Sequence, residues 1–376
     1  MTMNSTQRPR GQEVRRHGGA VTAVVSLAML GFFCAGSAAG VDTTGSPCDN
    51  PSAGGPATVA FCQGIEKQER GDTDGAIGDF VHALELQPGL TDAHLLLGVG
   101  YFDRKDYRRA IEEYDKYLAV IPDNYHAWSN RAVACLRSGN LAAARADIDR
   151  AIELKPHDPA LLENRVVIAR ESEDFKTVIT DCTWLIEHYP PKVTWLMDRG
   201  KALGAQSRYV ESLADFQRVV KLAPTADAYY YRGVTRYFLE QYEAAVADLS
   251  QALSLDADFA PAYLKRCTAH YYRQEYLSGI KDCDEFVRRK PDSYDGYYHR
   301  GILRSRAGDQ DGALVDYRRA VDLAGNPTDA GNAWYGVGLA NERAGRMTEA
   351  RQGYQRAVEV YPAQTQAQEA LRRLQK

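Results

Sequence analysis

Residues 91–124 have the sequence TDAHLLLGVGYFDRKDYRRAIEEYDKYLAVIPDN, and this stretch decides the fold. Apolar residues follow helical spacing over Asp92–Arg104, a turn is expected at Lys105–Asp106, and helical spacing returns over Tyr107–Val120. Pro122 then ends the second segment, because proline lacks an N–H and restricts the residue before it. The stretch therefore predicts two antiparallel helices joined by a short turn.

The same pattern recurs along the chain with a period of 34 residues. Small residues occupy the eighth and twentieth positions of most units, where two antiparallel helices pack so closely that larger side chains would force them apart. Prolines keep the same interval and stand at Pro88, Pro122, Pro156, Pro190 and Pro224. We predict nine units over residues 57–364, with starts at 57, 91, 125, 159, 193, 226, 260, 294 and 331.

The units are expected to stack on one another. One helix pair is too small to bury its apolar faces, whereas neighbouring pairs bury them together in one continuous core. An amphipathic segment at residues 365–376 is expected to be a helix that caps the open end. Bulky residues at the twenty-fourth position would fill the space between neighbours, as at Phe80, Tyr114, Ile148, Phe216, Tyr317 and Tyr354.

This pattern resembles the tetratricopeptide repeat family. The resemblance is carried by Gly or Ala at position 8, an aromatic residue near 17, Ala at 20, an aromatic at 24, Ala at 27 and Pro at 32. It implies an all-α, right-handed superhelical solenoid of helix–turn–helix repeats that serves as a protein-binding scaffold. The resemblance says little about the partner, because one fold can carry many unrelated functions.

The first forty residues are predicted to be a secretory signal peptide. Four arginines precede an uncharged run from Gly18 to Val41 that ends in small residues. The alternative is an uncleaved inner-membrane anchor, because the run is just long enough to span a bilayer. We expect the protein to contact the membrane only if this segment is not cleaved. Residues 41–56 would form a linker. We expect the array to be periplasmic or secreted or, with the anchor, to face the periplasm.

Arginine at position 7 and aspartate at position 23 occur together in six units. The two units with Leu97 and Val337 in place of the arginine also lack the aspartate and have Glu113 and Gly353. A row of arginines could bind an anionic ligand, but the matched presence and absence favours a bridge between facing helices. The pairs are Arg131–Asp147, Arg165–Asp181, Arg199–Asp215, Arg232–Asp248, Arg266–Asp282 and Arg300–Asp316.

The cysteines indicate a possible disulfide and no metal site. Cys48 and Cys62 flank a Pro/Gly-rich stretch, where a disulfide would staple the start of the array in an oxidising compartment; free thiols are the alternative. Cys267 and Cys283 occupy positions 8 and 24 of one unit and are interpreted as small core residues. No C-x-x-C pair or Cys/His cluster occurs, so we predict neither metal nor cofactor.

Composition and motifs argue against several classes of function. The chain has 46 Lys+Arg and 50 Asp+Glu, a net charge of −4, which does not suit a protein that neutralises phosphates on nucleic acid. No zinc-protease, nucleophile-elbow or phosphate-loop motif is present, so we predict no enzyme and no small-molecule substrate. We expect a scaffold of the bacterial cell envelope that binds a peptide or protein in its concave groove. The alternative is a structural or assembly module of an envelope or secretion complex that uses its outer surface or self-associates.

In the family that the sequence resembles, positions 2, 5, 9 and 12 of each first helix line the concave side. Tyrosine suits such a surface, because its ring buries area while its hydroxyl keeps a hydrogen-bond partner. Tyr230, Tyr237, Tyr271 and Tyr298 lie on this stripe, where we expect core packing not to require a large ring. The resemblance implies a groove for an extended, partly apolar peptide at Phe102, Tyr230, Val234, Tyr237, Leu264, Tyr271, Tyr298, Ile302, Tyr335 and Leu339.

Overall fold

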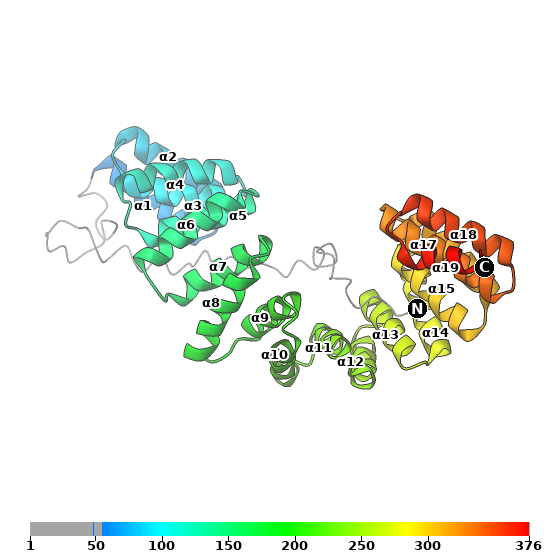
Figure 1. Ribbon diagram of the computed structural model, residues 1–376. Helices are drawn as coiled ribbons and strands as arrows, with labels where there is room; N and C mark the ends of the chain where they lie inside the picture. Colours follow the sequence, from blue (N-terminus) through cyan, green and yellow to red (C-terminus); the bar gives the residue numbers. More distant parts are fainter. Residues whose placement is uncertain (1–47, 49–54, 376) are drawn as a thin grey trace. The chain divides into compact units, whose positions relative to one another are not determined.

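The computed structural model describes residue 48 and residues 55–375, which fall into two compact units. We call residues 48 and 55–205 the N-terminal unit and residues 206–375 the C-terminal unit, and each is described by itself. Within the described residues both units are helical and contain no strand (Figure 1). The predicted signal peptide or anchor at residues 1–40 lies outside the described residues, as does most of the predicted linker.

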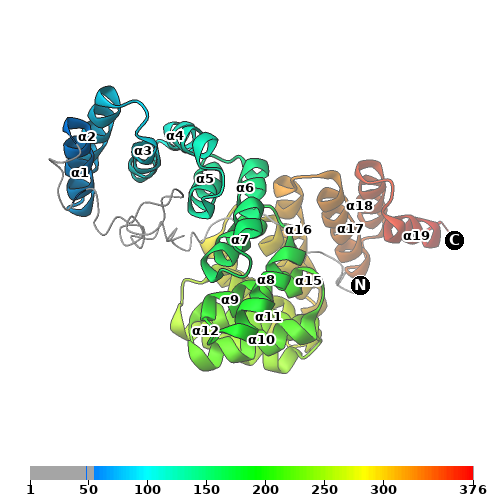
Figure 2. The same ribbon diagram turned by 90° about the vertical axis from the view of Figure 1, so that its left-hand side faces the viewer.

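The N-terminal unit is a run of antiparallel helix pairs. Each second helix packs on its own partner and on the first helix of the next pair, so that α2 contacts both α1 and α3 (Figure 2). Its helices are α1 (Pro56–Glu69), α2 (Thr73–Leu86), α3 (Thr91–Asp103), α4 (Tyr107–Val120), α5 (Tyr125–Arg137), α6 (Leu141–Leu154), α7 (Pro159–Glu171), α8 (Phe175–His188) and α9 (Val193–Ala205).

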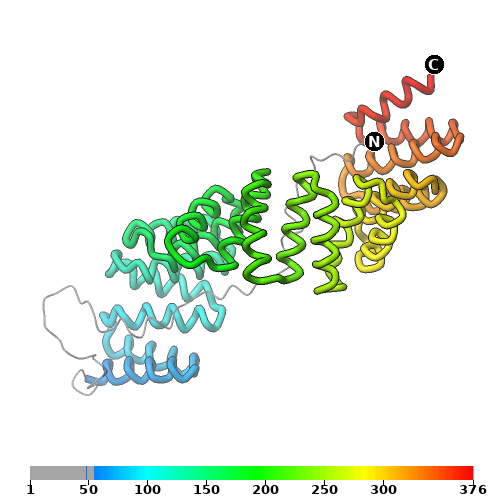
Figure 3. Tube along the Cα trace, turned by 90° about the horizontal axis from the view of Figure 1, so that it is seen from below, coloured from blue at the N-terminus to red at the C-terminus, as the bar shows by residue number. Residues whose placement is uncertain are grey.

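The C-terminal unit follows the same plan, and in the Cα trace its consecutive helices lie beside one another (Figure 3). Its helices are α10 (Tyr209–Leu222), α11 (Ala226–Phe238), α12 (Tyr242–Leu255), α13 (Ala260–Tyr272), α14 (Tyr276–Arg289), α15 (Tyr294–Ala307), α16 (Gln310–Leu323), α17 (Pro327–Arg343), α18 (Met347–Val360) and α19 (Thr365–Arg373). The all-α solenoid of helix–turn–helix units predicted from the period is confirmed.

Small residues at position 8 allow the close helix contacts that the sequence predicts. A Cβ atom on Gly338 would lie 2.5 Å from Cδ1 of Tyr354, and one on Gly64 would lie 2.5 Å from Cε1 of Phe80. Both rings are fully buried. The first and second helix of a pair therefore approach closely because the aromatic ring of one lies against bare backbone of the other.

Local signals set the helix ends. The side chains of Asp106, Asn140 and Asp174 each accept a hydrogen bond from a backbone N–H in the first turn of the following helix, which satisfies one of its unpaired donors. Between the two helices of each pair, position 15 has a positive φ, at Gly71, Lys105, Gly139, Glu173, Ser207, Glu240, Gln274, Gly308 and Gly345. This left-handed residue lets the chain reverse within a very short turn.

One helix begins earlier than expected. α17 begins at Pro327, whereas the period places the start of that unit at 331. Proline is favoured at the first position of a helix, and Asn326 caps the backbone N–H of Asp329, so the extra residues extend the helix by about a turn. At the end of the chain, α19 packs on α18 and buries Ala367 and Ala370. None of the described helices has the length and apolar character needed to cross a bilayer.

Candidate functional site

The predicted groove residues all lie on first helices of pairs. Phe102 lies on α3 in the N-terminal unit, and the other nine lie on α11, α13, α15 and α17 in the C-terminal unit. Leu264, Tyr271 and Ile302 are buried, and the remaining seven are half-buried. None of the ten is freely exposed, so each packs against neighbouring side chains as well as facing any partner.

The tyrosines on this stripe take part in the core more than the sequence suggested. Tyr271 is only 9% exposed and belongs to one buried cluster with Ile302 and Tyr317, and Tyr298 packs against that cluster. The ring of Tyr237 lies 5.8 Å from that of Tyr272 in an edge-to-face arrangement. The expectation that core packing does not require a large ring is therefore wrong for Tyr271. Whether the stripe binds a partner stays a prediction.

Burial shapes the electrostatics of this stripe. It raises the pKa of Tyr237 and of Tyr298 well above the usual value of tyrosine, so both hydroxyls stay protonated at neutral pH. The pKa of His299 is lowered to about 4, chiefly by burial and to a smaller extent by Lys265, although Asp295 acts in the opposite direction. The stripe therefore presents neutral rings rather than titrating charges near pH 7.

The arginines at position 7 form bidentate bridges to the aspartates at position 23. In the pair Arg165–Asp181, both nitrogen–oxygen distances are 2.7 Å. The same geometry occurs in the pairs Arg131–Asp147, Arg232–Asp248, Arg266–Asp282 and Arg300–Asp316. The predicted bridge between helices is confirmed for these five pairs. The pair Arg199–Asp215 involves both units, and its bridge stays a prediction.

Most of these arginines make a further contact that the sequence analysis missed. The Nη1 atom of Arg165 donates to Asp149 at 3.1 Å, and that of Arg300 donates to Asp284 at 2.7 Å. Arg131 and Arg266 reach Asp115 and Ser250 in the same way. Each acceptor precedes its arginine by 16 residues and lies on the second helix of the preceding pair. One guanidinium therefore connects three consecutive helices. The polar residue 16 positions before each of these arginines can be seen in the sequence, and this spacing could have predicted the second contact.

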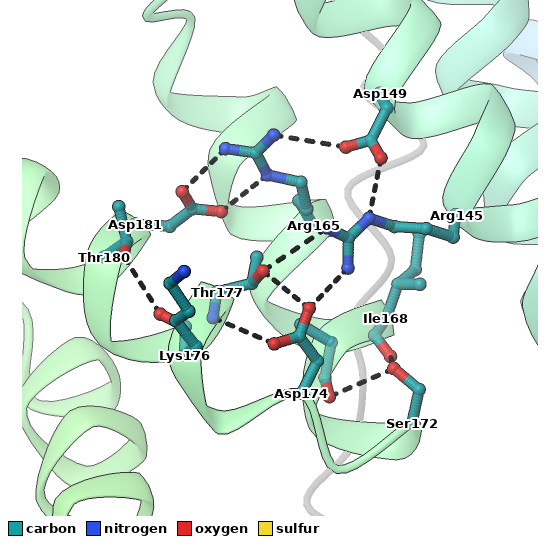
Figure 4. A network of polar contacts seen from close by, with 11 residues as sticks. Arg145, Asp149, Arg165, Ile168, Ser172, Asp174, Lys176, Thr177, Thr180 and Asp181 are labelled. Carbon is teal, nitrogen blue, oxygen red and sulfur yellow. Dashed lines mark hydrogen bonds and ion pairs between the residues drawn. The ribbon is translucent and has the colours of Figure 1, made fainter.

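A polar network joins α6, α7 and α8 and lines a cleft of about 310 Å³ (Figure 4). Asp149 accepts from both Arg145 and Arg165, and Arg145 also donates to Asp174 at 2.7 Å. Each arginine in the cleft thus has carboxylate partners on two sides. The alternative hypothesis, in which the arginines bind an anionic ligand, is not supported here, because aspartate carboxylates of the protein already balance their charges.

The structure forms two disulfides. Cys48 is joined to Cys62, with 5.4 Å between their Cα atoms, and this links the chain before α1 to α1 itself. Cys267 and Cys283, interpreted from sequence as small core residues, are fully buried and are also joined, with 5.6 Å between their Cα atoms. Positions 8 and 24 also face each other at Gly64 and Phe80 and at Gly338 and Tyr354, and this placement brings the two sulfurs within bonding reach.

The remaining cysteines and acidic residues give no sign of a metal centre. Cys135 and Cys182 are buried and belong to neither disulfide. Asp72, in a stretch that faintly resembles a calcium loop, instead caps α2 by accepting from the backbone N–H of Gly75. Across the part of the chain that the structure describes, no group of three or more His, Cys, Asp or Glu residues is arranged to hold a metal ion.

Comparison with known proteins gives the chain a family context. The model of the family described as "Tetratricopeptide repeat" matches residues 63–120, 95–159, 197–263 and 316–367, together more than half of the chain. A solved structure of a tetratricopeptide repeat protein from Parabacteroides merdae has a TM-score of 0.52 at 19% identity and covers 67% of this chain and 99% of that chain. At this level of identity the likeness shows the fold alone.

Curated relatives are similar over part of their length. Mitochondrial import receptor subunit TOM70 from Homo sapiens is 26% identical over 215 residues, which are 53% of this chain and 30% of that protein. Hsp70-Hsp90 organizing protein 3 from Arabidopsis thaliana is 25% identical over 236 residues, which are 58% of this chain and 40% of that protein. The chain thus spans less than half the length of these relatives.

Proposed function

The chain belongs to the tetratricopeptide repeat family, and on this basis we propose that it is a non-enzymatic scaffold of the bacterial cell envelope that binds a protein or peptide in a concave groove. Proteins of this family are generally protein-interaction scaffolds, and two similar proteins are named for such roles, an import receptor subunit and an organizing protein. The observation that carries the proposal is the tyrosine-rich stripe on α11, α13, α15 and α17.

We infer nine repeats of the family in this chain. The period in the sequence gives nine starts, and a left-handed residue recurs at position 15 of each of these units, from Gly71 to Gly345. A turn with the same backbone conformation at the same place in each unit indicates one repeated structural element. The family model matches four stretches, and the units between them are inferred from the period and from this recurring turn.

Two features support export to an oxidising compartment. The N-terminal segment has the composition of a signal peptide, with a basic start, an apolar run and a small-residue exit. The structure also joins four cysteines as Cys48–Cys62 and Cys267–Cys283. Disulfides form and persist in the periplasm and outside the cell, whereas thiols in the cytosol are kept reduced.

Site-specific photo-crosslinking in the living cell tests where the partner binds. A photoreactive amino acid at Val234 or Leu339 lies on the predicted groove, and the same amino acid at Leu277 or Val210 lies on the exposed face of a second helix. We expect a crosslinked product of one discrete size from the two groove positions and none from the two outer positions. The reverse pattern would favour the alternative, an assembly module that acts through its outer surface.

A further inference from the structure

Two places along the arginine series have an apolar residue instead, Leu97 and Val337, and a cleft lies beside the first of them. In the second helix pair, position 7 is Leu97, and a cleft of about 340 Å³ opens between α2 and α4 with α3 as its floor. Elsewhere an arginine contacts the residues 16 positions before and after it, as Arg165 contacts Asp149 and Asp181. The residues 16 positions before and after Leu97 are Val81 and Glu113, and all three line the cleft.

Glu113 occupies position 23, where five other pairs have the bridging aspartate. Its carboxylate is 12% exposed and is held by His94, whose Nδ1 lies 2.6 Å away, and by Lys116, whose Nζ lies 2.7 Å away. These two groups use only part of the acceptor capacity of a carboxylate, which has about four lone-pair sites. Lys116 is 55% exposed, so a stronger donor can displace it without burying an unpaired charge.

The rest of the lining suits a guanidinium group. Val81, Leu84 and Tyr101 provide apolar surface, and Glu85 adds a second carboxylate one helical turn after Val81. A guanidinium is weakly hydrated, packs flat on apolar and aromatic surface, and bonds a carboxylate through two parallel N–H groups. Two arginines of this protein already combine such contacts: Arg131 bonds Asp115 and lies over the ring of Trp128, and Arg300 bonds Asp284 and lies over the ring of Tyr297.

We propose that the cleft between α2 and α4 is a binding site for an arginine side chain of a partner protein. The partner's arginine would supply the guanidinium that is missing because position 7 is Leu97. The proposal rests on the proposed function, since it assumes a protein partner, and adds a contact away from the predicted groove. His94, Leu97 and Tyr101 lie on a different face of α3 from Phe102, given 3.6 residues per helical turn.

Methyl NMR of the purified protein with three probe peptides tests the site. The peptides are acetyl-Ala-Arg-Ala-amide and its counterparts with citrulline or lysine in place of arginine. We expect the arginine peptide to shift the methyl signals of Val81, Leu84 and Leu97 saturably, and the other two to bind at least tenfold more weakly. Equal binding of the citrulline peptide, or no localised shift with the arginine peptide, overturns the proposal.

Two substitutions sharpen the test. Leu97→Arg places a guanidinium in the cleft from the protein itself and should abolish binding of the arginine peptide. Glu113→Gln should weaken it at least tenfold, and it remains usable if Leu97→Arg does not fold. The matched control Glu112→Gln makes the same chemical change on an exposed residue of α4 and should leave binding unchanged. Full binding by Glu113→Gln overturns the proposal.

The occupant is tested separately from the groove. Self-association of the protein that Leu97→Arg abolishes would identify a second copy as the source of the arginine and overturn the assignment to a different protein. If Val234 and Leu339 give no crosslink to a partner while the arginine peptide still binds, the proposal of a partner-binding groove is contradicted and the proposal of this arginine site is not. The two proposals can therefore fail independently.

Discussion

Arg165 illustrates how one side chain connects three helices in this fold. Its Nε and Nη2 atoms bond Asp181, and its Nη1 atom bonds Asp149. The hydrogen bond to Asp181 raises the pKa of the guanidinium, which therefore stays charged at neutral pH. The side chain of Asp181 is only 3% exposed, so removing either partner would leave the other charged group of this ion pair unmatched on its buried side.

Replacing Asp181 with alanine should be more destabilising than the loss of a surface ion pair. Breaking a buried pair by removing one partner costs about 3–5 kcal/mol, whereas exposed pairs contribute about 0–1 kcal/mol. Urea denaturation of Asp181→Ala, Arg165→Ala and the double variant measures the coupling between the two side chains. A double-mutant cycle with no coupling would mean that the bridge does not form in solution.

Asp174 predicts a loss of stability in acid. Hydrogen bonds from the Thr177 hydroxyl and from Arg145 lower the pKa of its carboxyl group to about 2 in the folded state, from a usual value of 3.8. Its contribution to stability is therefore present above about pH 4 and disappears as the pH falls toward 2. Asp174→Asn keeps a good helix cap but removes the charge.

The melting temperature of Asp174→Asn should lie below that of the unmodified protein at pH 6. The difference should shrink as the pH falls from 4 to 2, because protonation then removes the same charge from Asp174. Thermal melts followed by circular dichroism at several pH values measure this difference. A gap that stays constant down to pH 2 would show that the charge of Asp174 is not its source.

At the scale of the element, the turn inside each helix pair carries a strained residue in several units. Lys105 has φ of +62° and Glu240 has φ of +59°, whereas Gly139 and Gly308 occupy the same position in other units. The left-handed conformation brings Cβ close to the following carbonyl oxygen and costs roughly 1–2 kcal/mol for residues other than glycine. Glycine has no Cβ and adopts this conformation freely.

Exchanging the residue types at two such turns should therefore have opposite effects. Lys105→Gly should stabilise the protein by about 0.5–1 kcal/mol, after allowing for the greater entropy of glycine in the unfolded chain. Gly139→Lys, at the same position of the next helix pair, should destabilise it by a similar amount. Urea denaturation compares the two variants. Effects of the same sign at both turns would contradict the assigned backbone conformation.

At the scale of the whole molecule, structural features that recur from unit to unit could be predicted from the sequence, whereas features of a single unit could not. The 34-residue period gave the helix pairs, and paired occurrence of arginine and aspartate gave the bridges, because each signal recurs in unit after unit. The bond between Cys267 and Cys283 and the cleft beside Leu97 occur once each. Such features depend on three-dimensional neighbours that a single substitution in a repeat does not reveal.

The burial of Tyr271 could not be predicted for a related reason. Its position in the unit was assigned to the predicted groove by resemblance, but it lies in one buried cluster with Ile302 of the following unit, and its hydroxyl accepts a hydrogen bond from Arg306 of that unit. A stack of repeats is stabilised by contacts between neighbouring units, so the exposure of one residue depends on the residue types in the next unit. Position alone therefore places a side chain on a helix without fixing how deeply it is buried.

The disulfides link the structure of the chain to the compartment in which it folds. If the protein is exported, Cys48, Cys62, Cys267 and Cys283 should be oxidised, while the buried thiols of Cys135 and Cys182 stay reduced. Closing a loop of about 15 residues contributes roughly 3 kcal/mol by restricting the unfolded chain. Loss of these bonds in a reducing compartment should therefore lower the stability of the array.

Alkylation in denaturant followed by mass spectrometry measures this prediction directly. Protein isolated from the cell envelope should take up alkylating reagent at Cys135 and Cys182 but not at the four paired cysteines until it is reduced. The control is the same chain expressed without residues 1–40 and trapped in the cytosol, where all six cysteines outside that segment should react. That form should also melt at a lower temperature, because both loops are then open in its unfolded state. Reaction of Cys267 and Cys283 in the envelope form would show that the buried pair is a thiol pair, and would remove the strongest structural support for export.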